Sequence, residues 1–136
     1  MAYADLAALV ARYGMDTILV ASDRDQDGVI DAGVIEQATA DASAEIDSYV
    51  GALHRLPLAS VPEVLVRLCC DIALYRLSMD AGSGTEEKRT RYEDAVALLR
   101  RIASGDVSLG MPTPVEEATS GFAFFEAQPK RFGQLL

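Results

Sequence analysis

The sequence contains few of the residues on which catalysis and metal binding usually depend. Its 136 residues include one histidine, two cysteines and no tryptophan. His54 has no nucleophile or orienting acid nearby in the sequence, so we expect a surface or helix-capping residue rather than a catalytic base. Ser–His–Asp and Cys–His arrangements, phosphate-binding glycine loops and zinc-ligand spacings are also absent. These absences favour a binding protein over an enzyme and give no indication of a cofactor.

The cysteines do not form a disulfide framework. Cys69 and Cys70 are adjacent and cannot join distant parts of the chain, so we expect buried, inert thiols in a reducing compartment. Long apolar runs are missing as well, and none approaches the length of a membrane span. The N-terminus carries an early acid, Asp5, and lacks the basic region of a secretory signal. We therefore expect one cytosolic domain with its own hydrophobic core.

Basic residues are outnumbered, with 12 against 21 acidic ones, and the net charge is −9. This balance argues against tight or sequence-specific nucleic-acid binding, which needs a basic surface. The charge is also uneven, because acids dominate residues 16–47 and basic residues gather in residues 85–101. The basic cluster is typical of a solvated helix face or of a subunit contact. The candidates for such a contact are Lys88, Arg89, Arg91, Arg100 and Arg101.

What the sequence does contain is helical periodicity. Residues 60–79 (SVPEVLVRLCCDIALYRLSM) are apolar around most of a helix, with polar residues mainly along one line, and predict a central helix that others surround. Ser60 and Glu63 have the spacing of a capping box, with Pro62 in the first turn. The fold class we expect is all-α, with about four to five helices in residues 1–105 and an extended C-terminal arm in residues 106–136. The other helices are expected near residues 4–13, 16–20, 32–53 and 86–104.

Residues 23–31 (DRDQDGVID) match the first half of a calcium-binding loop, with acids at positions one, three, five and nine and glycine at position six. Position twelve, where a bidentate carboxylate is expected, is Val34. The alternative is a polar turn in which Gly28 has a positive φ and Asp31 caps the next helix. The candidate metal ligands are Asp23, Asp25, Asp27 and Asp31.

From residue 106 onward, prolines and glycines exclude a long helix. Disordered tails are usually poor in aromatic residues, yet this segment holds all four phenylalanines of the chain. The arm therefore either folds on its own domain or buries its aromatic side chains on another subunit or protein, and we favour the second interpretation. These side chains are Phe122, Phe124, Phe125 and Phe132.

Several separated motifs resemble one known family. They are, in order, MAYAxxxxLxxRYG, DRDxDGxID, ADASAEIDSYV, LPLxSVPExLxRLxCDIAxYRL and RYEDAxxLLxxIxxGxVSLG, and together they cover residues 1–110. In content and order these motifs are similar to the phage Mu-like head–tail connector proteins of tailed phages and prophages.

This resemblance implies a small helical bundle, many copies of which form a ring beneath the portal of the capsid. The implied partners are further copies of the chain, the portal protein and the next neck or tail protein. DNA passes through the lumen without specific binding, and the C-terminal segment binds the portal. The resemblance implies no enzymatic activity and a place in the virion neck after assembly in the host cytoplasm. The other hypothesis, a calcium-responsive helical binding module, depends on residues 23–31 alone.

Overall fold

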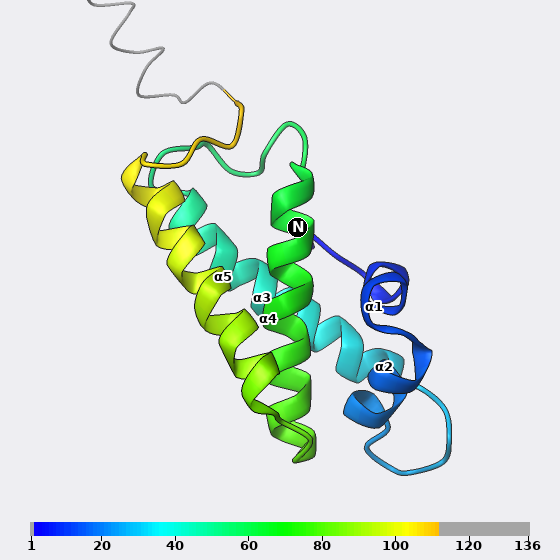
Figure 1. Ribbon diagram of the computed structural model, residues 1–136. Coiled ribbons are helices and arrows are strands. Elements are labelled where there is room, and N and C mark those ends of the chain that lie inside the picture. Colours follow the sequence, from blue (N-terminus) through cyan, green and yellow to red (C-terminus); the bar gives the residue numbers. More distant parts are fainter. Residues whose placement is uncertain (1, 112–136) are drawn as a thin grey trace, which may run out of the picture.

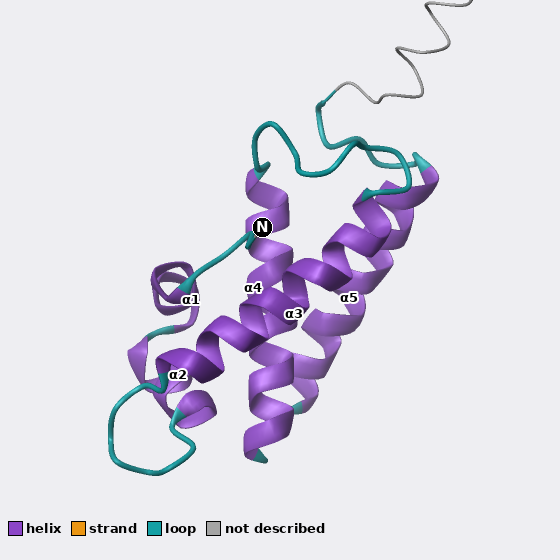
Figure 2. Cartoon of the chain, turned by 180° about the vertical axis from the view of Figure 1, so that it is seen from behind, coloured by secondary structure: helices purple, strands orange, loops and turns teal. Residues whose placement is uncertain are grey.

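The computed structural model describes residues 2–111, within which it contains five α-helices and no strand. The three long helices α3, α4 and α5 form a bundle, and the short helices α1 and α2 cover one side of α4 (Figure 1, Figure 2). The all-α fold class predicted from the sequence is confirmed. The helices are α1 (Leu6–Tyr13), α2 (Met15–Ser22), α3 (Ala32–Val50), α4 (Glu63–Ala81) and α5 (Glu86–Ser104).

Helix α4 lies at the centre of the fold and contacts each of the other four helices. A helix that is apolar around most of its surface is stable in water only when other elements surround it. Here α3, α5 and the α1–α2 pair cover α4 from different sides (Figure 1). Five of its large aliphatic side chains are almost completely buried: Leu65, Leu68, Ile72, Leu74 and Leu77.

The start of α4 differs from the predicted capping box. The helix begins at Glu63, Pro62 is its N-cap residue with extended backbone, and no side chain caps it. A proline disfavours helical backbone in the residue before it. Residues 60–61 therefore stay outside the helix, and the predicted reciprocal contact between Ser60 and Glu63 does not form. At the other end, Gly82 adopts the left-handed conformation that closes the helix.

Two residues assigned to the polar line of α4 are buried. Ser78 is fully enclosed, and Asp71 is 8% exposed. The hydroxyl of Tyr13 in α1 donates a hydrogen bond to Asp71, and the Arg67 guanidinium lies 3.5 Å from its other oxygen. Desolvation by burial, together with the contact to Asp71, raises the pKa of Tyr13. The phenol therefore stays protonated and holds the end of α1 against α4.

A second polar contact joins the three long helices. Glu45 of α3 accepts a hydrogen bond from Arg76 of α4 and another, of 3.0 Å, from the hydroxyl of Tyr92 in α5. The Tyr92 ring also stacks on Tyr75 of α4, with ring centroids 4.3 Å apart and planes 11° from parallel. Hydrogen bonds and ring stacking thus add to apolar packing in setting the position of α5.

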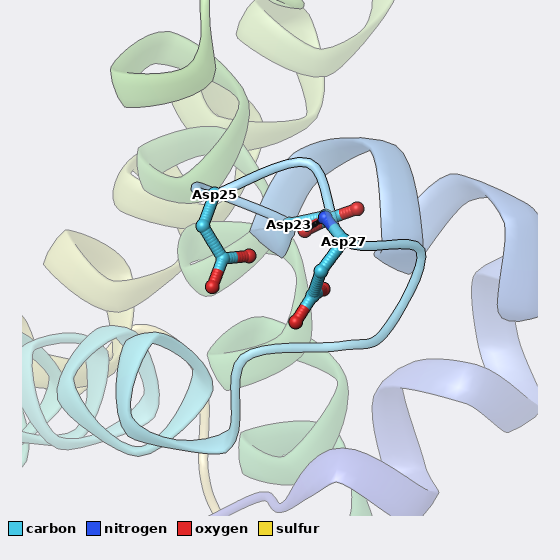
Figure 3. Close-up of side chains that lie close together, drawn as sticks. All are labelled: Asp23, Asp25 and Asp27. Atoms are coloured by element: carbon cyan, nitrogen blue, oxygen red, sulfur yellow. Dashed lines mark hydrogen bonds between the residues drawn. The ribbon is translucent and has the colours of Figure 1, made fainter.

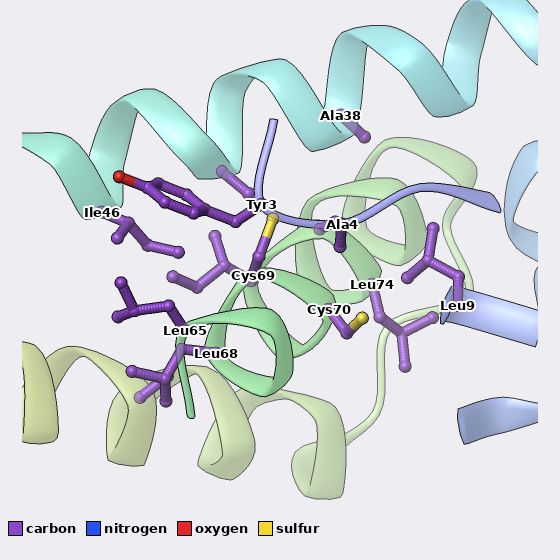
Figure 4. Packing of buried hydrophobic residues seen from close by; sticks show 14 of the residues in the cluster. Tyr3, Ala4, Leu9, Ala38, Ile46, Leu65, Leu68, Cys69, Cys70 and Leu74 are labelled. Atoms are coloured by element: carbon purple, nitrogen blue, oxygen red, sulfur yellow. The ribbon is translucent and has the colours of Figure 1, made fainter. Parts of the chain in front are cut away.

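The N-terminal segment packs against α3 and α4, where Tyr3 is 4% exposed (Figure 4). The backbone N–H of Tyr3 donates to Ser43 at 3.0 Å, and its hydroxyl donates to Asp47, so both contacts tie the segment to α3. Cys69 and Cys70 are completely buried and unpaired, as the sequence predicted. Desolvation by burial raises the pKa of both thiols, that of Cys70 to about 11, so both are protonated at neutral pH.

The connection between α3 and α4 corrects the prediction for His54. This residue is 8% exposed, and neither ring nitrogen has a hydrogen-bond partner within the described part of the chain. It is therefore neither a surface residue nor a side-chain cap. Helix α3 ends at Val50, before the predicted end at Leu53, and the chain then folds over the end of the bundle. The burial of Leu58 in the same connection shows how apolar residues draw this segment, with His54, onto the core.

Helix α5 begins and ends as predicted. The Thr85 side chain caps its first turn, and Gly105 ends it with a left-handed backbone (φ 87°). Beyond the helix, the backbone N–H of Val107 donates to the carbonyl of Arg101 at 3.2 Å. Residues 106–111, which the sequence assigned to the arm, therefore lie against the bundle. Their apolar side chains, which pack on its core, are Val107, Leu109 and Met111.

Candidate functional site

The basic residues taken as interface candidates all lie on α5, but they differ in their surroundings. Lys88 donates to a backbone carbonyl in the turn before the helix. Arg89 pairs with Glu93 at 3.1 Å and Arg91 with Glu87 at 3.0 Å, each pair being one helical turn apart. Exposed pairs of this kind add little to stability, but they neutralise the charge locally. These three residues thus have partners within their own helix and turn.

Arg100 and Arg101 have different surroundings. Both are exposed at the C-terminal end of α5, and neither forms an ion pair with any residue that the structure describes. The helix dipole favours positive charge at this end, so the two guanidinium groups are stable there without an acidic neighbour. They are the two candidates on α5 that have neither an ion-pair partner nor a side-chain hydrogen bond to their own turn among the described residues.

We use the name acidic loop for residues 23–31, which connect α2 to α3. One carboxylate oxygen each of Asp23, Asp25 and Asp27 lies within 4.8 Å of the other two (Figure 3). Asp23 accepts the backbone N–H groups of Asp27 at 3.1 Å and Gly28 at 2.8 Å, and Gly28 has the predicted positive φ of 82°. The structure thus brings together three of the four candidate ligands. Asp31 lies apart from them as the N-cap residue of α3.

The carboxylates of the acidic loop alter one another's ionisation. Desolvation opposes the charged form of Asp23, but the backbone hydrogen bonds from Gly28 and Asp27 prevail and lower its pKa. The side-chain contact with Asp23, partial desolvation and repulsion by Asp27 raise the pKa of Asp25. A hard cation would relieve this repulsion through three carboxylate ligands. Val34, at position twelve, packs against the core and offers no ligand.

Arg24, the one basic residue of the acidic loop, does not balance these acids. Its guanidinium donates to the backbone carbonyls of Ala21 and, at 3.4 Å, of Leu77 in α4. No carboxylate of the loop forms an ion pair with a residue in the described part of the chain. The loop therefore presents uncompensated negative charge beside α2.

The aromatic arm residues Phe122, Phe124, Phe125 and Phe132 lie outside the described residues. The described chain ends at Met111, at the same end of the bundle as the α3–α4 connection, whereas the acidic loop lies toward the other end (Figure 1). Within residues 2–111, the buried apolar side chains are aliphatic residues, two cysteines and Tyr3. The bundle thus forms its core without phenylalanine.

Sequence reasoning missed a second basic group. One surface hollow, around Tyr13 and Asp71, is lined by arginines from three helices: Arg12 of α1, Arg67 of α4 and Arg91 of α5. Of the three arginines, only Arg91 was a candidate, because nothing in the sequence links helices so far apart in the chain. The sequence did contain one signal. Asp71 lies within a helix that is covered on all sides, and a buried acid requires hydrogen-bond donors around it.

None of the described helices is both long enough and apolar enough to cross a membrane. The sequence profile of a family described as "Bacteriophage Mu, Gp36" matches residues 3–126. This match extends beyond residue 110, where the resemblance seen in the motifs ended, and it includes Phe122, Phe124 and Phe125 but not Phe132.

Two relatives agree with the profile. The Mu-like prophage FluMu protein gp36 of Haemophilus influenzae is 36% identical over 118 residues, which are 87% of this chain and 82% of that protein. Gene product J of Escherichia phage Mu is 34% identical over 129 residues, which are 94% of this chain and 90% of that protein. The chain therefore belongs to the bacteriophage Mu Gp36 family of phage and prophage proteins.

Proposed function

We propose that this protein is a head–tail connector subunit. Several copies form a ring that joins the portal of a phage capsid to the next neck or tail protein, and DNA passes through the lumen. Family membership supports a phage protein, and the motif resemblance supports the connector role. The observation that carries the proposal is the distribution of phenylalanine: the described core contains none, and all four follow residue 111. Aromatic residues beyond a closed core are suited to anchor an interface.

The charge distribution supports self-association in a ring. A ring is built from heterologous contacts, in which one patch of a subunit meets a different patch of its neighbour. Arg100 and Arg101 lie at one end of the bundle, and the acidic loop lies toward the other, so they cannot neutralise each other within one chain (Figure 1). Opposite charges on two separate patches favour a single register between neighbours. The net charge of −9 would also keep passing DNA from adhering.

Replacing all four arm phenylalanines by alanine in the full-length chain is expected to prevent tail attachment. Each anchoring ring that is lost weakens the contact by about tenfold or more, because truncating such a residue commonly costs about 2 kcal/mol. The measurement is the fraction of tailed particles, counted by electron microscopy, in phage that carry Phe122→Ala, Phe124→Ala, Phe125→Ala and Phe132→Ala together.

A matched control removes apolar side chains that are exposed on the described bundle. Met15 and Val20 on α2 are 54% and 64% exposed, and the variant Met15→Ala/Val20→Ala should give tailed particles at the normal yield. Circular dichroism of the purified fourfold variant should show an unchanged helical bundle. Normal tail attachment by the fourfold variant would contradict the assignment of the arm to a partner.

Reversing the charge of Arg100 and Arg101 is expected to weaken subunit association by about tenfold or more at low salt, because attraction becomes repulsion at a complementary patch. The measurement is sedimentation of the purified protein, alone and with purified portal. The control Lys88→Glu/Arg89→Glu changes the net charge equally, at residues whose partners lie in their own helix and turn. Equal behaviour of the two variants would remove Arg100 and Arg101 from the interface.

A calcium-responsive binding module is the second candidate function, and one observation favours it: three carboxylates gather within 4.8 Å in the acidic loop. A ligand that binds only the folded chain must raise the melting temperature. Weak extracellular-type calcium sites have dissociation constants of roughly 0.1–1 mM, so a concentration about tenfold higher, near 10 mM, would fill such a site. If the loop is one, this concentration should raise the melting temperature of the wild type but not that of Asp25→Asn/Asp27→Asn. An unchanged wild-type melting temperature, with ionic strength matched by sodium chloride, would identify the loop as a turn.

A further inference from the structure

A polar hollow of about 430 Å³ lies where α1, α4 and α5 meet, and we name it the arginine hollow. Its lining contains three guanidinium groups and one carboxylate, so it carries a local charge of +2 (three arginines minus one aspartate) in a protein whose net charge is −9. Such a local reversal of sign attracts an anionic group. The lining residues are Arg12, Tyr13, Arg67, Asp71 and Arg91.

The guanidinium groups of the arginine hollow retain hydrogen-bonding capacity. Arg67 lies 3.5 Å from Asp71, and Arg12 lies 3.7 Å from Glu63. Both distances exceed the 2.7–2.9 Å, roughly, of a strong charge-assisted hydrogen bond. Arg91 lies over the Tyr13 ring, with its guanidinium carbon 5.7 Å from the ring centroid, and this contact holds the guanidinium beside the hollow that it lines.

The acids that approach the rim are poor competitors for a ligand. The side chains of Glu63 and Glu87, which pair with Arg12 and Arg91, are 84% and 74% exposed. Ion pairs to such exposed carboxylates contribute little and exchange readily. Asp71 is instead buried and bound to Tyr13, so it orders the hollow without filling it.

Planar guanidinium groups match the geometry of carboxylates and phosphates. The acidic loop of a second copy is a suitable source of carboxylates, because its acids have no ion-pair partner among the described residues and the Arg24 guanidinium binds backbone carbonyls instead of them. The arginine hollow contains no residue of its own chain's acidic loop. The overall negative charge disfavours a nucleic-acid phosphate as the alternative.

We propose that the arginine hollow receives the carboxylates of Asp23, Asp25 and Asp27 from a neighbouring copy of this chain. The inference rests on the proposed function to the extent that a ring supplies the neighbour. It assigns the acidic loop of one copy to the face shared by α1, α4 and α5 of its neighbour, and it leaves Arg100 and Arg101, at the end of α5, to a separate part of the subunit interface.

The test uses the full-length protein, labelled with ¹⁵N, and a synthetic peptide of residues 21–32 as the probe. The peptide is expected to shift the arginine side-chain resonances of the hollow and to saturate, with Arg91→Gln weakening the affinity about fivefold or more, as expected for loss of a charge-assisted contact. The matched control is Arg89→Gln, which lies on the same helix and also pairs with a glutamate one turn away but does not line the hollow. It should change the affinity less than about twofold.

Several results would overturn the proposal. These are the absence of saturable shifts, equal weakening by Arg91→Gln and Arg89→Gln, and equal binding of a peptide with asparagine in place of all three aspartates. Binding of inorganic phosphate or random-sequence duplex DNA at the hollow without peptide binding would assign it to a phosphate ligand instead. The titration needs neither the portal nor a ring. Peptide binding can therefore succeed even if the protein proves not to be a connector, and it can fail even if the protein is one.

Discussion

Replacing Leu68 by alanine is expected to lower the free energy of unfolding by about 3–5 kcal/mol, the upper part of the range for buried leucine-to-alanine changes. Leu68 is completely buried in α4, the helix that contacts all the others. The bundle cannot collapse around the missing atoms without moving several helices, so the cavity cost adds to the lost transfer free energy. Urea denaturation followed by circular dichroism measures the change.

The control for this prediction lies on the same helix. Met79 is of similar size but 55% exposed, so Met79→Ala should change the free energy of unfolding by less than about 1 kcal/mol. A loss of similar size for both variants would mean that the position in α4, and not burial, determines the effect. A loss below about 1 kcal/mol for Leu68→Ala would contradict the central place of α4 in the core.

Breaking the contact between Tyr13 and Asp71 is the second large expected effect. Tyr13→Phe removes the hydroxyl donor and leaves Asp71, which is 8% exposed, with the long 3.5 Å contact to Arg67 as its remaining side-chain hydrogen bond among the described residues, so we expect a loss of about 1–3 kcal/mol. Asp71→Leu alone leaves the Tyr13 hydroxyl without its acceptor and should cost a similar amount. Both changes are measured by denaturation at pH 7, where Tyr13 is neutral: the ordinary pKa of a tyrosine already lies well above 7, and burial raises that of Tyr13 further.

The double variant Tyr13→Phe/Asp71→Leu distinguishes a specific contact from general damage. When both partners become apolar, no buried group is left without a hydrogen bond, so the combined loss should be smaller than the sum of the single losses by about 1 kcal/mol or more. Strict additivity would show that the two side chains stabilise α1 and α4 independently. Tyr92→Phe, which removes a hydroxyl bound to Glu45 elsewhere in the bundle, should be additive with either change.

The features of the fold that the sequence predicted correctly are mostly local. The positive φ of Gly28 and the end of the last helix at residue 104 were both predicted correctly, because the residue types in the immediate stretch of chain determine them. The central helix was also predictable, since its hydrophobic pattern requires a covering on all sides. The first helix begins at Leu6, later than predicted, because Asp5 caps it through the N–H of Ala8 at 3.0 Å.

The errors arose where tertiary packing determined the environment. Asp71 and Ser78 were placed on the polar line of the central helix, and both are buried because the four helices around α4 leave little of its surface exposed. His54 became buried because the segment after α3 folds over the bundle, which no local pattern indicated.

The candidate sites also divide into a local feature that the sequence predicted and a tertiary feature that it did not. The spacing of Asp23, Asp25 and Asp27 within one short loop was enough to predict that their carboxylates meet. The arginine hollow draws its residues from three helices, so only the fold could bring them together. The roles of the phenylalanine arm and of Arg100 and Arg101 stay predictions, since they concern contacts with other molecules.

The complete burial of Cys69 and Cys70 has a practical consequence for studying assembly. The chain has no other cysteine, and thiols that are enclosed and protonated react slowly with maleimides. A single cysteine introduced at an exposed position such as Val20 should therefore be labelled selectively, without removal of the native pair. Fluorescent or spin probes attached there would report distances between neighbouring copies in an otherwise unaltered protein.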